Sequence, residues 1–160
     1  MAHHPRPFLG LLAGVAAGLV ASAAMAAFQS RAQKLLPDEG GDGDPATVKA
    51  ADAASEAIAG DPVPAPYRKP AGQAVHYLVG GVLGGIYGVL TEYRPAARAG
   101  FGSAYGIATA ALIDEVAVPA VGLGAAPDEV PLATHFYGAA SHLVYGWVLE
   151  GVRTLIAGRR

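Results

Sequence analysis

The chain has 160 residues, of which 52% are hydrophobic and only 15% are charged, and its formal net charge is −2. Average soluble domains are about a quarter charged, so this composition and the mean hydropathy of +0.35 favour helices surrounded by lipid over a small soluble core. The charge gives no basic surface for nucleic acid, and the absence of cysteine excludes disulfides, thiolate nucleophiles and cysteine-based zinc sites.

The first apolar segment runs from Phe8 to Phe28 without a charged residue. About twenty residues, rising roughly 1.5 Å each, are enough to cross the hydrocarbon core of a bilayer. We therefore expect an N-terminal transmembrane helix within residues 1–29. A cleavable signal peptide ending near residues 24–26 is the alternative interpretation. Small residues at every fourth position predict a close contact with another helix, and they are Gly10, Gly14, Gly18 and Ser22.

Residues 30–70 form the one extended polar region and carry seven of the thirteen acidic residues. We expect a long, partly disordered loop on the extracytoplasmic side. Asp44 followed by Pro45 is typical of a helix start and Gly60 of a helix end, which predicts a short helix over about residues 45–59. The proline-rich residues 61–70 are expected to be an extended linker.

Residues 71–157 contain three further apolar segments, and we expect transmembrane helices at about residues 72–92, 98–122 and 130–155. The first of these carries a second small-residue stripe for helix packing, made of Gly80, Gly84 and Gly88. With the N-terminal helix, the three segments predict an all-α integral membrane protein built as a four-helix bundle.

Basic residues near the ends of the spans predict the orientation, because cytoplasmic ends carry an excess of Lys and Arg. In a four-span topology one side carries most of them, namely Arg6, Arg94, Arg98, Arg153, Arg159 and Arg160. The opposite side carries the acidic loop and the link over residues 122–131, which contains no Lys or Arg. Both termini are therefore expected in the cytoplasm.

Ionisable residues interrupt the last three spans, and they are His76, Asp114, Glu115, His135 and His142. From the rise per residue, all five fall about 5–18 Å below the extracytoplasmic surface, in one half of the bundle. A charged group in hydrocarbon is costly, so such residues usually face a protein interior or a water-filled cavity and mark a functional site.

The chemistry of these five residues leaves several interpretations open. Imidazole and carboxylate groups can sense or relay protons, since histidine titrates near neutral pH. They are also ordinary ligands for transition metals, and two histidines on facing helices could ligate a haem. The alternative is a purely structural role, in which these residues pair with one another and only fix the register of the helices. Three further residues, Glu92, Glu150 and Arg153, are expected to be exposed interfacial charge anchors at helix ends.

The second to fourth spans resemble the YagU-like inner-membrane protein family, a bacterial family whose domain has no established biochemical function. The resemblance rests on three stretches: His76-x-x-x-x-Gly81…Tyr87…Glu92-x-x-Pro95, then Pro119…Gly122-Leu123…Pro127, then Gly138…Ser141-His142-Leu143-Val144…Glu150-x-x-Arg153. It implies a multi-spanning protein of the bacterial inner membrane and supplies no activity. Asp114 and Glu115 do not map onto the family pattern.

The sequence thus predicts a non-enzymatic structural or accessory bundle with a buried His/carboxylate cluster that senses or relays protons. The alternative is a metal- or haem-binding accessory subunit of a larger respiratory or transport complex. An intramembrane enzyme ranks third, because no nucleophile–base pair is identifiable, and no P-loop, nucleophile elbow or HExxH motif is present. We expect no cofactor in the leading case and leave a metal open. The expected partners are the lipid bilayer and either further copies of the chain or a larger membrane complex, and not nucleic acid.

Overall fold

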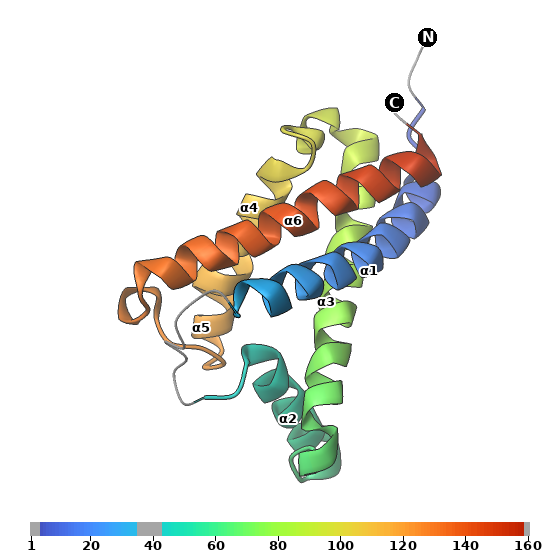
Figure 1. Ribbon diagram of the computed structural model, residues 1–160. Coiled ribbons are helices and arrows are strands. Elements are labelled where there is room, and N and C mark those ends of the chain that lie inside the picture. Colours follow the sequence, from blue (N-terminus) through green and yellow to red (C-terminus); the bar gives the residue numbers. More distant parts are fainter. Residues whose placement is uncertain (1–3, 35–42, 159–160) are drawn as a thin grey trace.

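The computed structural model describes residues 4–34 and 43–158, which form helices joined by short turns, with no strand among them (Figure 1). This confirms the all-α class predicted from the sequence. The long helices are α1 (Pro7–Ala32), α2 (Ala46–Ala59), α3 (Arg68–Tyr93) and α6 (Leu132–Ala157). Between α3 and α6 the chain forms α4 (Ser103–Leu112), a π-helical turn (Ile113–Ala117) and α5 (Val118–Ala120). Single 3₁₀ turns lie at Ala65–Tyr67, Pro95–Arg98 and Pro127–Glu129.

Helix α1 runs antiparallel to α6, and the two lie side by side (Figure 1). At one end, the Arg6 guanidinium donates a hydrogen bond to the carbonyl oxygen of Ala157 at 3.0 Å. At the other end, the Phe28 ring stacks on Tyr137 with 6.5 Å between the ring centroids. The first and last described turns of the chain therefore lie at the same end of the bundle, as an even number of membrane crossings would require.

The two small-residue stripes lie against each other where α1 crosses α3. In antiparallel order, the facing pairs are Gly10 with Gly88, Gly14 with Gly84, and Gly18 with Gly80. A β-carbon added at Gly10 would lie 2.5 Å from the carbonyl oxygen of Gly88 and 2.9 Å from the Glu92 side chain, so any larger residue overlaps α3. The backbones of the two helices touch directly, which is how small residues favour close helix packing.

The third predicted span is not one regular helix. The predicted segment over residues 98–122 starts with a 3₁₀ turn and continues from Ser103 as α4, the π turn and α5. Its first part packs on α6 in the same close manner as α1 on α3. A β-carbon on Gly106 would overlap the carbonyl oxygen of His142, and one on Gly102 would overlap that of Gly146.

Helix α2 packs along the N-terminal half of α3, away from the crossing with α1 (Figure 1). Gly72 permits the approach, since a β-carbon there would lie 2.6 Å from Cγ2 of Val48. Ion pairs hold the same two helices together: the Arg68 guanidinium lies 2.7 Å from Asp44 and also contacts Asp52.

The polar region differs from the prediction at its end. Helix α2 occupies nearly the predicted residues 45–59, and Gly60, with φ +87°, follows it as the left-handed residue that ends the helix. The linker expected over residues 61–70 is shorter, because a 3₁₀ turn starts at Ala65 and α3 starts at Arg68. Residues 35–42, part of the segment expected to be disordered, lie outside the described residues, as do Arg159 and Arg160.

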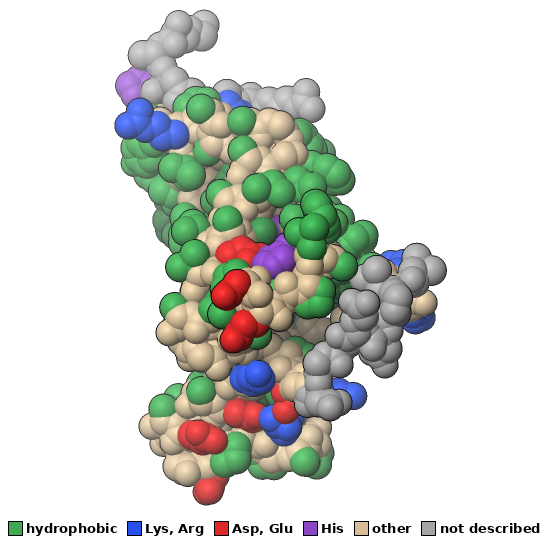
Figure 2. Space-filling model, turned by 90° about the vertical axis from the view of Figure 1, so that its left-hand side faces the viewer, with side chains coloured by type: hydrophobic (Ala, Val, Ile, Leu, Met, Phe, Trp, Pro, Cys, Tyr) green, Lys and Arg blue, Asp and Glu red, His purple; other side chains and the backbone are tan. Residues whose placement is uncertain are grey.

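Two segments, Pro7–Ala32 and Ala65–Tyr93, are long and apolar enough to cross a membrane. Helix α6 has 26 residues, but ionisable residues interrupt its apolar sequence. Large apolar side chains point outward on several helices, among them Phe8, Leu12, Leu78, Val82, Leu112, Phe136 and Leu155. Hydrophobic side chains cover the upper part of the face in Figure 2, and charged side chains gather in its lower part, where α2 lies. The structure thus supports membrane association through two of the four predicted spans.

Candidate functional site

The five ionisable residues expected to form one cluster are arranged as two pairs and a separate histidine. Nδ1 of His142 lies 3.3 Å from Oδ2 of Asp114, and Nδ1 of His135 lies 2.7 Å from Oε1 of Glu115. Nε2 of His76 lies 3.1 Å from the carbonyl oxygen of Ser22 on α1. Acidic side chains next to a histidine are visible in the middle of the face in Figure 2.

The π turn directs its two neighbouring acidic residues, Asp114 and Glu115, toward α6. The N–H of Val118 donates to the carbonyl oxygen of Ile113, five residues back, and Pro119 has no N–H with which to continue the α-helical pattern. Asp114 and Glu115 lie in this widened turn, and each pairs with a different histidine of α6. Single π turns inside helices occur frequently at functional sites.

The two paired histidines differ in their hydrogen-bond partners. His135 has an acceptor at each ring nitrogen, Glu115 at Nδ1 and the Pro127 carbonyl oxygen at Nε2 (3.0 Å), and only the imidazolium can donate to both. His142 has its acceptors at Nδ1 alone, where Gly138 O lies 3.0 Å away and Asp114 lies opposite. Nε2 of His142 has no hydrogen-bond partner among the described residues, so it is the ring nitrogen left available to a ligand or a proton.

A cavity of about 750 Å³ opens between α1, α2, α3 and the paired α4–α6 segments. His76, Asp114 and His142 line it, while Glu115 and His135 do not. The Asp114 side chain keeps 39% of its surface exposed, whereas that of His142 keeps 9%. The site accessible to small molecules is therefore the Asp114–His142 pair, with His76 on the facing helix.

The cavity also contains polar atoms without a partner among the described residues. The hydroxyls of Ser22 and Tyr137 are buried and accept or donate no hydrogen bond there, although both residues line the cavity. Nearby, the Tyr145 hydroxyl donates to the Gly80 carbonyl oxygen at 2.6 Å. Buried unpaired polar groups are costly and are commonly satisfied by water or a ligand.

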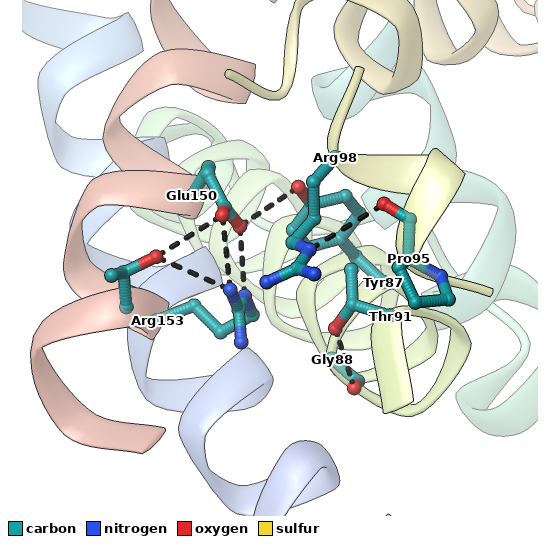
Figure 3. A network of polar contacts seen from close by, with 8 residues as sticks. Tyr87, Gly88, Thr91, Pro95, Arg98, Glu150 and Arg153 are labelled. Carbon is teal, nitrogen blue, oxygen red and sulfur yellow. Dashed lines mark hydrogen bonds and ion pairs between the residues drawn. The ribbon is translucent and has the colours of Figure 1, made fainter. Parts of the chain in front are cut away.

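A second polar network lies at the opposite end of the bundle, near the start of α1 (Figure 3). Glu150 accepts hydrogen bonds from the Tyr87 hydroxyl (2.9 Å), from Nε of Arg153 (2.8 Å) and from the Thr154 hydroxyl (3.1 Å). Glu150 and Arg153 are only 4% and 3% exposed. Nη2 of Arg153 donates a fourth hydrogen bond to the carboxylate at 2.9 Å. All acceptor positions of Glu150 are therefore used within the protein, and this network is a structural contact between α3 and α6.

Burial corrects the expectation that Glu92, Glu150 and Arg153 lie exposed at helix ends. Glu92 is also buried and accepts a hydrogen bond of 2.7 Å from the backbone N–H of Arg6. The spacing of the charges could not show this burial, because an acidic and a basic residue spaced i, i+3 on a helix form the same pattern whether the pair faces water or protein. The one sequence signal for burial is Tyr87, because a tyrosine hydroxyl requires a hydrogen-bond partner inside a bundle.

The chemistry available at the cavity is proton exchange and binding of polar or charged groups. Among residues 4–34 and 43–158, no group of three or more His, Asp or Glu side chains is placed to hold a metal ion. Asp114 and His142 are the facing ionisable side chains of the cavity, so this pair is the place where a polar or charged group would bind.

Comparisons with known proteins identify a family whose members have no known function. No curated protein and no solved structure matches the chain. Residues 67–151, just over half of the chain, match the family described as "Protein of unknown function (DUF1440)". The matched region begins with α3 and includes Asp114, His142, Glu150 and all the helices between. The chain therefore belongs to this family of proteins of unknown function.

Proposed function

We propose that the protein is an integral membrane bundle that crosses the bacterial inner membrane four times, with both termini in the cytoplasm. Two apolar helices and the outward-facing apolar side chains support this proposal. The contact of Arg6 with Ala157 also supports it, because it brings the start of α1 next to the end of α6. The resemblance to YagU-like inner-membrane proteins supports the same assignment, and the excess of Lys and Arg supports the orientation.

Within this bundle we propose that the Asp114–His142 pair takes up and releases protons from the cavity, so that the protein senses or relays protons without catalysing a reaction. The observation that carries the proposal is the 3.3 Å approach of His142 Nδ1 to an Asp114 side chain that is 39% exposed. Protonation of Nε2 converts a neutral donor into an imidazolium facing a carboxylate. That change alters the charge of the cavity and the attraction between the π turn and α6.

Proton flux into liposomes containing purified protein tests the relay. We expect flux above that of empty liposomes, reduced at least severalfold by Asp114→Asn and by His142→Gln. Glu115→Gln is the matched control, because it changes the neighbouring acid, which does not line the cavity. Equal flux in the wild type and both cavity variants would refute the relay. Proton sensing is tested separately by histidine NMR: a His142 titration that Asp114→Asn leaves unchanged would refute it.

A further inference from the structure

The cavity has one acidic group that no fixed positive charge neutralises. Asp114 has His142 as its ion-pair partner among the described residues, and no Lys or Arg there lies within ion-pair distance of it. Two basic residues also line the cavity, both at the α2 side: Arg68 is already paired with Asp44 and Asp52, and Lys69, next to it in the chain, is exposed and does not contact Asp114. A carboxylate at Asp114 therefore faces the cavity without a described Lys or Arg in contact with it.

The walls around this carboxylate are mostly apolar and partly aromatic. Lining residues from four helices include Met25, Val79, Leu83, Ile113, Tyr137 and Tyr145. A volume of about 750 Å³ lies within the usual range of small-molecule sites, in which apolar walls hold the ligand and a few polar groups orient it. Aromatic rings and a carboxylate together favour a positively charged ligand.

We infer that the cavity binds a monovalent organic cation with a hydrophobic body, with Asp114 as its counter-ion. The inference rests on the proposed function, because the cation would bind at the same Asp114–His142 pair that is proposed to take up protons. A small inorganic cation would leave most of the apolar wall unfilled, and an anion would meet the Asp114 charge. A cationic amphiphile satisfies both features of the cavity.

Protons should compete with such a ligand, because an imidazolium at His142 or a proton on Asp114 removes the charge that attracts it. The other titratable or charged residues that line this space come from α3, α6 and the turn before α2, whereas α1 contributes uncharged Gln29 and Gln33. They are Asp44 before α2, Arg68, Lys69 and His76 on α3, and Tyr137 and Tyr145 on α6. The contribution of His76, the other histidine that lines the cavity, is separated by the variant His76→Gln.

Equilibrium binding of tetraphenylphosphonium to the full-length protein in detergent, at pH 8 and at pH 5.5, tests the inference. We expect saturable binding at pH 8, weakened by about tenfold or more at pH 5.5 and by a similar factor in Asp114→Asn at pH 8. Glu115→Gln is the control and should bind as the wild type does. Ala26→Phe, which adds a ring to the cavity wall, should also abolish binding while Asp114 remains in place.

The outcomes separate this inference from the proposed function. Absence of saturable binding in the wild type, or equal binding in Asp114→Asn and Ala26→Phe, overturns the cation site even if proton flux is normal. Retained, pH-dependent binding in a protein without proton flux supports the cation site and refutes the relay. If Asp114→Asn fails to fold, as judged by its helical circular dichroism, the comparison of Ala26→Phe with Glu115→Gln decides the result.

Discussion

The hydroxyl of Tyr87 on α3 donates a hydrogen bond of 2.9 Å to Oε2 of Glu150 on α6, and both side chains are almost fully buried. Sixty-three residues separate them in the chain. This contact joins α3 and α6, which cross one another (Figure 1), at the end of the bundle where the glycine faces of α1 and α3 also meet. Three predictions concern the stability of that assembly.

Replacing Tyr87 by Phe removes one donor from a buried carboxylate while keeping the ring. Hydrogen bonds to charged groups contribute about 1.5–3 kcal/mol, and we expect the free energy of unfolding to fall by that amount. Unfolding of the purified protein by a denaturing detergent measures it. Tyr93→Phe is the control, since that side chain is 56% exposed; an equal loss in both variants would show that the Tyr87–Glu150 bond has no special role.

Replacing Arg153 by Met leaves Glu150 buried with no cation beside it. Breaking a buried ion pair from one side costs about 3–5 kcal/mol, so we expect a larger loss of stability than in Tyr87→Phe. Adding Glu150→Gln to Arg153→Met should recover part of the loss, because the double variant has no unpaired charge. The exposed Arg94 provides the control variant Arg94→Met. Additive losses in the double variant would contradict the pairing.

Replacing Gly84 by Ala puts a methyl group where the carbonyl oxygen of Gly14 lies. The obstructing atom belongs to a helix backbone and cannot rotate away, so we expect a loss of about 1–3 kcal/mol. Gly151→Ala provides a matched control on α6, where the nearest atom to an added β-carbon is 3.7 Å away. That change should be neutral or stabilising by up to about 1 kcal/mol, because Ala favours a helix. Thermal unfolding of both variants decides between the two expectations.

The sequence is sufficient to place most helices and insufficient to pair them. Apolar runs and the spacing of Gly10, Gly14 and Gly18 indicate where α1 lies and which face packs closely. The contact between Glu150 and Tyr87 is harder to predict from the sequence. Arg153 at i+3 already provides an ion-pair partner for Glu150, and no local pattern indicates that Tyr87 is a second partner. The π turn also cannot be predicted from the sequence, although Pro119 indicates an interruption of the helix. Which histidine pairs with Asp114 and which with Glu115 depends on the position of α6.

The docking of α2 on α3 should weaken in acid. The hydrogen bond from Arg68 is the largest reason that the pKa of Asp52 lies below its usual value of 3.8. A depressed pKa means that the contact stabilises the folded state fully above the usual value and is lost as the pH falls below it. Hydrogen exchange of α2 amides should therefore accelerate below about pH 4 relative to α6 amides.

Asp52→Asn should show that faster α2 exchange already at neutral pH and lose most of the acid dependence. Glu56→Gln serves as the control on the same helix, because Glu56 forms no ion pair among the described residues. An acid response that is unchanged in Asp52→Asn would assign it to another group.

The most direct test of the account is labelling by a membrane-impermeant maleimide in intact cells, which is clean because the natural chain has no cysteine. The variants Ala53→Cys, Ala96→Cys and Ala125→Cys place single thiols at exposed positions in α2, after α3 and before α6. Four crossings predict labelling of residues 53 and 125 from outside, and of residue 96 only after the membrane is opened. Labelling of residue 125 only under the conditions that label residue 96 would remove the crossing between them and contradict four crossings, and a chain recovered in the soluble fraction would contradict the membrane bundle altogether.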